Sequence, residues 1–132
     1  MNFNVYDNVE VKKSTVTNGF GCFAIRNIMK DEMIYKDEFL RFPADVVDKI
    51  FSLNSREKNM AMMEKMWGCG NDYCISLNID QYINHSNNPN CCDGIALKDI
   101  KKGDEILENY SDFDNEEWFQ EMNKKMNTWC YQ

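Results

Sequence analysis

The 132 residues include 22 Asp and Glu against 15 Lys and Arg, a net charge of −7 at pH 7. With no basic run longer than a Lys-Lys pair, the composition argues against nucleic-acid binding and suits a basic protein or peptide partner, although such a charge also simply keeps a domain soluble. A chain of this length buries roughly 65–70% of its unfolded surface, so a core needs neither disulfide nor metal.

Six cysteines raise the question of the redox compartment. The start Met-Asn-Phe-Asn lacks the charged and apolar stretches of a secretory signal, and no apolar run approaches the roughly 18 residues of a membrane-spanning helix. We therefore expect reduced thiols and a soluble intracellular protein, located in the nucleus or the cytoplasm.

Residues 1–40 predict a meander of short strands, because Val9 and Val11 alternate with charged residues and Gly19 and Gly21 mark turns. From Pro43 the apolar period becomes helical. A first helix would bury one face made of Val46, Val47, Ile50 and Phe51. A second, after the candidate cap Ser55, would carry Met60, Met63 and Trp67.

Residues 68–76 predict a loop and a strand, and residues 84–90 an irregular loop with an Asn-Asn-Pro-Asn turn. A turn at 102–104 leads into the segment 105–110. Asp114 and Glu117 match a capping box ahead of a closing amphipathic helix with Trp118, Met122, Met126 and Trp129 at helical spacing.

The chain contains no internal repeat, low-complexity tract or linker, so the sequence predicts a single domain. Its expected parts are an N-terminal β part (1–40), a helical insert (41–74), a C-terminal β part (75–113) and a closing helix (114–132).

Three segments, in this order and spacing, resemble the SET family of protein lysine methyltransferases. They are Gly-Phe-Gly-Cys-Phe-Ala at 19–24 with its Ile-x-Lys-Asp-Glu-x-Ile continuation at 28–34, Asn-His-Ser-Asn-Asn-Pro-Asn-Cys at 84–91, and Gly-Asp-Glu-Ile-Leu-Glu-Asn-Tyr at 103–110. The resemblance covers most of residues 8–120 and extends to the compact stand-alone SET proteins of large DNA viruses.

The resemblance implies a mainly β fold of short β-sheets with few helices, a C-terminal pseudoknot and a closing C-terminal helix. In the pseudoknot the C-terminal segment passes under a preceding loop, a threading that is rare in proteins. The second and third segments would thereby be pressed together to build a cofactor pocket and a narrow lysine channel.

The implied activity is transfer of a methyl group from S-adenosylmethionine to a lysine side chain, with a histone tail as the favoured substrate. One alternative is a non-histone target such as a translation factor or ribosomal protein. Another is a catalytically weak module that only binds a lysine-bearing peptide. A homodimer is also compatible with the resemblance, because some compact relatives pair to complete the substrate groove.

For the cofactor, the resemblance implies a backbone approach at Gly19, Phe20 and Gly21, although the glycines alone would also fit a turn. The Asn84 amide would hold the amino-acid part of the cofactor, and the His85 backbone would contact the adenine edge; the alternative for His85 is a packed loop residue. Trp118 would stack on adenine or, alternatively, serve only in helix packing.

Tyr110 is the implied catalytic residue, whose hydroxyl would line the methyl group while contributing to the cofactor site; the alternative is a packed strand residue. Glu108 departs from the family, which places Phe, Tyr or Ile there. If both residues lie in one strand, Glu108 shares the face of Tyr110 and would bind the lysine ammonium or accept its proton. The alternative is that local irregularity turns Glu108 to solvent.

No metal is expected. Only Cys130 follows Tyr110, and Asn87 replaces the cysteine of the middle segment, so the zinc ligands of cysteine-rich relatives are missing from the sequence. An irregular site made from Cys69, Cys74, Cys91 and Cys92 is the alternative.

Overall fold

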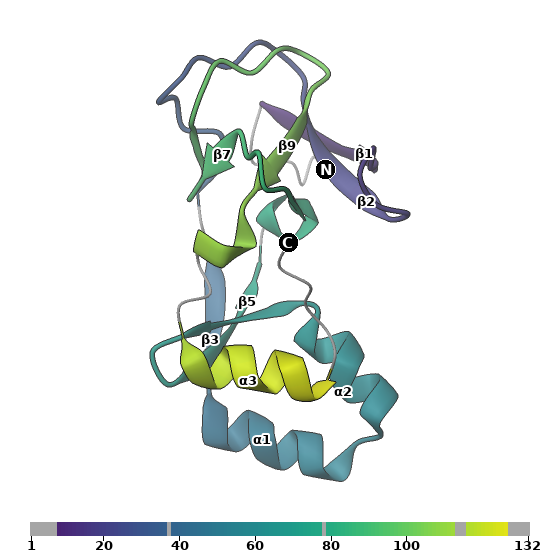
Figure 1. The fold of residues 1–132 in the computed structure, drawn as a ribbon. Helices are drawn as coiled ribbons and strands as arrows, with labels where there is room; N and C mark the ends of the chain where they lie inside the picture. The colour runs from purple at the N-terminus through teal and green to yellow at the C-terminus, as the bar shows by residue number, and fades with distance from the viewer. Residues whose placement is uncertain (1–7, 37, 78, 113–115, 127–132) are drawn as a thin grey trace, which may run out of the picture. The chain divides into compact units, whose positions relative to one another are not determined.

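Short strands outnumber helices among the described elements in a computed structural model of the chain (Figure 1). The structure describes residues 8–36, 38–77, 79–112 and 116–126. Contacts divide the chain into two compact units. Unit 1 comprises Met1–Glu38 with Asn78–Asn109, and unit 2 comprises Phe39–Leu77 with Tyr110–Gln132. Each unit is described by itself.

Unit 1 contains a four-stranded sheet in the order β1-β2-β9-β6. The antiparallel pair β1 (Val9–Lys13) and β2 (Phe20–Ala24) joins β9 (Glu105–Glu108), which also pairs antiparallel with β2. The two-residue strand β6 (Asn84–His85) runs parallel to β9. A short 3-10 helix, η1 (Ile79–Tyr82), precedes β6. The sheet thus brings the three motif segments together although up to 80 residues separate them.

A tight hairpin completes unit 1. β7 (Cys91–Cys92) and β8 (Ile95–Ala96) are joined by Asp93 and Gly94, whose φ angles are +51° and +79°. Two successive left-handed residues form the primed turn that matches strand twist, and Asp-Gly is a preferred sequence for it. One apolar core underlies the sheet and hairpin, made of Val9, Cys22, Ala24, Ile28, Ile34, Tyr35, Ile83, Cys91, Ala96, Ile100 and Ile106.

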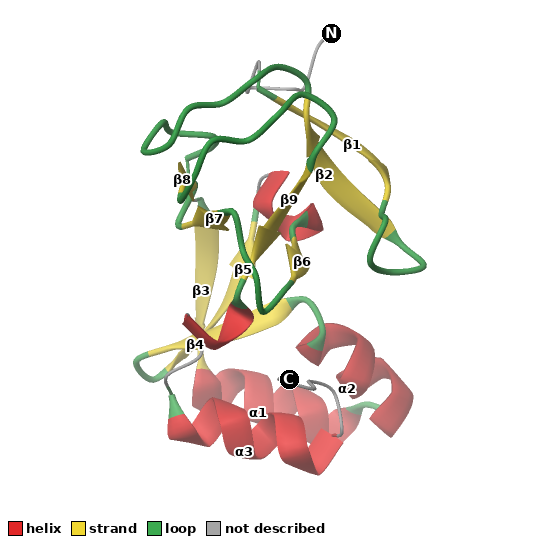
Figure 2. Cartoon of the chain, turned by 45° about the horizontal axis from the view of Figure 1, so that its top comes forward, coloured by secondary structure: helices red, strands yellow, loops and turns green. Residues whose placement is uncertain are grey.

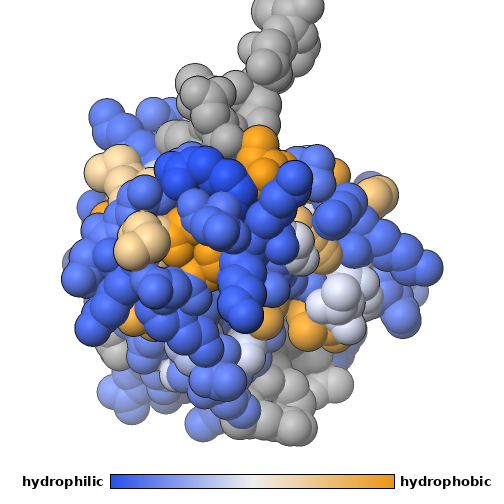
Figure 3. Space-filling model, turned by 90° about the horizontal axis from the view of Figure 1, so that it is seen from above, coloured by the Kyte–Doolittle hydropathy of each residue, from blue (hydrophilic) through white to orange (hydrophobic). Residues whose placement is uncertain are grey.

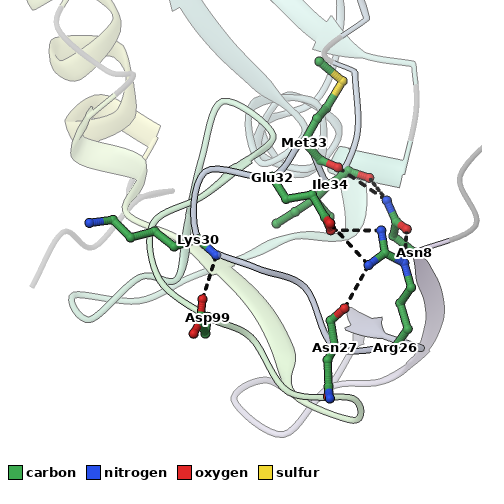
Figure 4. A network of polar contacts seen from close by, with 8 residues as sticks. All are labelled: Asn8, Arg26, Asn27, Lys30, Glu32, Met33, Ile34 and Asp99. Atoms are coloured by element: carbon green, nitrogen blue, oxygen red, sulfur yellow. Dashed lines mark hydrogen bonds and ion pairs between the residues drawn. The ribbon is translucent and has the colours of Figure 1, made fainter.

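A polar network fastens the segment between β2 and residue 34 (Figure 4). Arg26 forms an ion pair of 2.9 Å with Glu32 and donates through Nε to Asn8 Oδ1 at 2.7 Å. The Lys30 amide donates to Asp99 Oδ1 at 2.8 Å. These contacts are exposed and individually weak, but they hold the segment that leads to the buried Ile34 and Tyr35.

In its described residues, unit 2 combines a three-stranded antiparallel sheet with three α-helices (Figure 2). The sheet order is β3 (Phe39–Pro43), β5 (Asp72–Ser76), β4 (Met66–Cys69). The helices are α1 (Ala44–Leu53), α2 (Arg56–Met63) and α3 (Glu117–Met126). Both kinds of element contribute to one core of Val47, Phe51, Met63, Met66, Tyr73 and Phe119.

The predicted helices are confirmed with two corrections. Ser55 caps α2, accepting from the Lys58 amide at 3.3 Å. In α1 only Val47 and Phe51 are buried, whereas Val46 and Ile50 are 45% and 40% exposed, so the buried stripe is narrower than predicted.

The placement of Trp67 on the second helix is wrong, because α2 ends at Met63 and Trp67 lies in β4 opposite Cys74. Its ring stacks edge-on against Phe39 with centroids 4.9 Å apart. Pairing with β5 therefore overrides the helical spacing that Trp67 shares with Met60 and Met63.

The closing helix is present as α3, with Phe119 buried. A side chain at Gly68 would place its Cβ 2.8 Å from the Cβ of Phe119, so this glycine lets the helix approach β4. The predicted cap Asp114 and the last apolar position, Trp129, lie outside the described residues.

Charged and polar side chains dominate the face shown in Figure 3, where apolar residues form small separate groups. Within the described ranges, no helix combines the length and apolar character needed to cross a bilayer.

Candidate functional site

The centre of the candidate site is the parallel pairing of β6 with β9. Asn84 lies opposite Leu107 and His85 opposite Glu108, and the Ser86 amide donates to the Glu108 carbonyl at 2.9 Å. This is the contact between the second and third segments that a pseudoknot requires. Two backbone strands therefore fix the Asn-His-Ser segment directly beside the residues that precede Tyr110.

Asn90 extends this contact with its side chain. Its Nδ2 donates to the Glu105 carbonyl at 2.9 Å, and its Oδ1 accepts from the Leu107 amide at 2.9 Å. The Asn90 amide also donates to the Leu107 carbonyl at 3.1 Å. The buried carboxamide thus satisfies backbone groups of β9 as another strand would, which holds the loop after His85 against β9.

A buried carboxylate, Glu105 of the third segment, accepts hydrogen bonds from the β1–β2 connection and from the second segment. Oε2 accepts from Ser14 Oγ at 2.8 Å and from Asn84 Nδ2 at 3.1 Å. Oε1 accepts from the Thr15 amide at 2.8 Å and from Thr15 Oγ1 at 2.7 Å. Burial alone would raise the pKa of Glu105, but these donors together outweigh burial and lower it. Glu105 is therefore a charged anchor inside unit 1.

The position of the Glu105 carboxylate requires a glycine at position 21. A Cβ at this position would collide with Oε2 of Glu105 and come within 3.3 Å of Asn84 Nδ2. Gly19 has no such neighbour, since the nearest atom to a Cβ there is 3.7 Å away. Phe20 between them is 64% exposed. Gly21 therefore serves packing within unit 1, whereas there is open space around Gly19 and the Phe20 side chain.

The Asn84 amide nitrogen is engaged by the protein itself. Besides Glu105, it contacts the Phe20 carbonyl at 2.9 Å and Ser14 Oγ at 3.1 Å, three acceptors for two hydrogens. This arrangement links the first segment to the second. The Asn84 amide nitrogen therefore points toward protein acceptors rather than toward a ligand. The His85 ring lies within 3.2 Å of Asn87 Oδ1. The predicted cofactor contacts of both residues stay predictions.

Glu108 does not face solvent. It is 8% exposed, and its Oε1 accepts from the Tyr35 hydroxyl and, at 3.4 Å, from Cys91 Sγ. The alternative that local irregularity turns Glu108 outward is therefore wrong. Tyr110 does not share a strand with Glu108, because β9 ends at Glu108 and Tyr110 begins the 3-10 helix η2 (Tyr110–Asp112). Strand alternation therefore does not place the two side chains on one face.

Tyr110 and Trp118 belong to unit 2. Trp118 donates through Nε1 to the Gly70 carbonyl at 2.7 Å and stacks edge-on against Tyr73 with centroids 4.9 Å apart. These are the contacts that a helix-packing role predicts. A stacking role on adenine and the catalytic role of Tyr110 are not tested by this geometry.

The cysteines of the described ranges show no arrangement for metal. None of the five described cysteines, Cys22, Cys69, Cys74, Cys91 and Cys92, forms a disulfide. Among the residues that the structure describes, no three His, Cys, Asp or Glu side chains are grouped so that they could hold an ion.

Sequence reasoning missed the roles of Glu105, Ser14 and Asn90. Glu105 and Asn90 lie inside the segments that resemble the SET family, and this location was the sequence signal that could have identified them. Ser14 carries no such signal, because it joins the network only through the β1–β2 connection.

The SET-domain sequence profile matches residues 19–111. The chain therefore belongs to the SET-domain family. The predicted fold of mostly short strands, few helices and a C-terminal helix is confirmed. No curated protein sequence matches significantly.

Solved structures agree on the fold. A candidate histone methyltransferase of Plasmodium falciparum is 20% identical, with a TM-score of 0.59 over 86% of this chain and 99% of that one. Polycomb repressive complex 2 of Chaetomium thermophilum bound to S-adenosylmethionine is 21% identical, with a TM-score of 0.67 over 91% of this chain and 17% of that one. A humanized mutant of that complex bound to an inhibitor is 20% identical, with a TM-score of 0.63 over 85% and 16%. This chain thus spans about a sixth of the complex's matched chains.

Proposed function

We propose that this protein is an S-adenosylmethionine-dependent protein lysine N-methyltransferase whose favoured substrate is a histone tail. The observation that carries the proposal is the parallel β6–β9 pairing, which joins the Asn-His-Ser segment to the segment ending at Tyr110. SET-family membership over residues 19–111 supports methyltransferase activity. Of the similar structures, one contains S-adenosylmethionine and another is described as a candidate histone methyltransferase.

The cofactor would be held by residues of the recognised segments. The exposed Phe20 and the open space around Gly19 leave room for a ligand beside the first segment, which fits the predicted approach. Asn84 and His85 lie on β6 beside β9 and would bind its polar and adenine parts, with Gly21 providing the close packing behind them. Trp118 would cover adenine. The bound cofactor supplies an electrophilic methyl group on a sulfonium.

Tyr110 and Glu108 would carry the chemistry toward lysine. The Tyr110 hydroxyl, neutral at physiological pH, would align the reacting groups through weak polar contacts. A lysine ammonium has a solution pKa of about 10.4 and must lose its proton before it can attack. The buried carboxylate of Glu108 would bind that ammonium and accept the proton, directly or through water.

The substrate proposal follows from charge. An acidic domain attracts basic peptides, and histone tails are rich in lysine. A non-histone protein remains the second substrate class, and a lysine-peptide reader is the non-catalytic alternative. We propose further that the protein resides in the nucleus or cytoplasm, which would be that of a host cell if the source is a large DNA virus. The proposal also includes a homodimer.

Labelled S-adenosylmethionine distinguishes these functions. The protein is incubated with histones, with a matched set of histone-tail peptides and with whole-cell extract, and labelled bands are identified by mass spectrometry. Label on histone lysines supports the proposal, label on other proteins alone selects the second substrate class, and peptide binding without product selects the reader.

Tyr110→Phe tests the catalytic assignment. Because the ring survives and only the hydroxyl is lost, we expect methylation to slow by at least about tenfold while cofactor affinity stays within a few fold. Tyr82→Phe, at a partly exposed tyrosine of η1, is the matched control and should retain wild-type turnover. Wild-type turnover in Tyr110→Phe would remove Tyr110 from the mechanism.

A further inference from the structure

Three side chains from distant parts of unit 1 meet in its interior: Tyr35, Cys91 and Glu108. Their exposed fractions are 3%, 1% and 8%. The Tyr35 hydroxyl and the Cys91 thiol both donate to the same oxygen, Oε1 of Glu108. Two donors on one oxygen restrict rotation of the carboxylate, so the direction in which Glu108 points is set by its neighbours.

The protonation states of the two donors are defined by the same surroundings. Burial, and next the negative charge of Glu108, raise the pKa of the Tyr35 phenol far above its ordinary value. The same two causes, in the same order, raise the pKa of the Cys91 thiol. Both groups therefore stay protonated at physiological pH, and the carboxylate is the acceptor of the three.

Further acidic groups act on this part of unit 1. Asp80 of η1 contributes a negative charge that raises the pKa of Tyr35. Cys22 of β2 has a pKa raised to about 12 by burial and then by the charges of Glu105, Asp80 and Glu108. Tyr35 and Cys91 donate to the Glu108 carboxylate, and donors to a carboxylate favour its ionised form.

Tyr35 is itself held in place by backbone contacts. The Ile34 and Tyr35 amides approach the Gly94 carbonyl at 2.6 and 3.4 Å. A Cβ at Gly94 would collide with the Tyr35 carbonyl oxygen, so the hairpin turn lies directly against this residue. On the other side, the Glu108 backbone is fixed by the Ser86 amide. The phenol and the carboxylate thus meet from two independently fixed backbones.

We propose that Tyr35 is a positioning residue for Glu108 and, together with Cys91, sets the orientation and protonation of its carboxylate. The relevance of this role to lysine methylation rests on the proposed function. The resemblance places Phe, Tyr or Ile at position 108, so the cluster puts a hydrogen-bond acceptor where an apolar side chain is expected. Tyr35 would thereby determine the pH range in which Glu108 receives a lysine ammonium.

The test is the titration of Glu108 in the full chain, followed by carbon-13 NMR with labelled glutamate and assigned with Glu108→Gln. Removing the Tyr35 hydroxyl takes a donor from the charged form, so Tyr35→Phe should shift the titration midpoint of Glu108 upward by about one pH unit. Cys91→Ala should shift it less in the same direction, and Cys91→Ser, which keeps a donor, should restore it. Tyr82→Phe should leave it unchanged.

A midpoint within about 0.2 pH unit of wild type in both Tyr35→Phe and Cys91→Ala would overturn the proposal. If Tyr35→Phe fails to fold, the contrast between Cys91→Ala and Cys91→Ser decides it. This titration needs no activity, so it is separate from the proposed function, which fails if wild type methylates no protein. In an active enzyme, the acidic limb of the pH–rate profile should move with the NMR midpoint, and an unmoved limb in Tyr35→Phe would overturn the positioning role.

Discussion

Replacing Glu105 by Gln removes the charge at the centre of unit 1 while nearly preserving its shape. Hydrogen bonds to charged groups contribute about 1.5–3 kcal/mol each, against about 1 kcal/mol for neutral ones. Four donors reach this carboxylate, and the new amide would also set a donor against Asn84 Nδ2. Because these losses are not additive, we expect about 3 kcal/mol of destabilisation at pH 7.

The pH dependence provides a second check. The pKa of Glu105 is lowered in the folded state, so its stabilisation is complete above the unfolded value of about 4.3 and is lost as pH falls through the lowered value. The difference between wild type and Glu105→Gln should therefore be constant near neutral pH and shrink below about pH 4.

Urea unfolding followed by far-UV circular dichroism measures this difference. With a typical urea dependence, about 3 kcal/mol corresponds to a midpoint shift on the order of 1–2 M. Tryptophan fluorescence alone would not serve, because Trp67, Trp118 and Trp129 all fall in the ranges of unit 2. Glu10→Gln, at a half-exposed carboxylate 3.5 Å from Lys12, is the control and should shift the midpoint little.

A wild-type urea midpoint for Glu105→Gln at pH 7 would refute a stabilising role for the Glu105 charge. The same conclusion follows if the difference persists undiminished at pH 3, because the carboxyl of the unfolded chain is by then largely protonated. Either result would mean that the stabilisation from the hydrogen bonds to Glu105 does not depend on its negative charge.

Two further predictions concern the backbone. Gly94→Ala should destabilise unit 1 by about 2–4 kcal/mol, because it combines a left-handed φ of +79° with a collision against the Tyr35 carbonyl; a wild-type thermal midpoint would refute the close approach. Ser55→Ala should cost about 1 kcal/mol through loss of the α2 cap, whereas Ser55→Asp should retain the stability, as judged by urea unfolding followed by tryptophan fluorescence.

The parts of the fold that could be predicted from the sequence are those with a local pattern of residues. Alternation identified β1, the serine before an apolar period identified the start of α2, and three- to four-residue spacing identified α3. The resemblance, by contrast, was needed to predict that segments 84–91 and 103–110 meet. A two-residue strand such as β6 has no periodicity of its own and exists only because β9 lies beside it.

The site shows the limit of local reasoning more clearly. Glu105 follows a Lys-Gly-Asp turn and looks like a surface residue, yet its donors come from Ser14 and Thr15, some 90 residues away. Glu108 likewise gains its surroundings from Tyr35 and Cys91. Whether a carboxylate is buried depends on such distant donors, and a strand pattern counted along β9 contains no information about them.

The order of the strands in unit 1 has a consequence for synthesis of the chain. β2 and β9 are sheet neighbours, but all of residues 39–77 lie between them in sequence. At a translation rate of about 5–20 residues per second, the roughly 80 residues from Phe23 to Glu105 take about 4–16 s. For that interval β2 has only β1 as a partner and presents an open hydrogen-bonding edge, which other chains can pair with. Newly made chains stalled before residue 105 should therefore be the species most in need of chaperones.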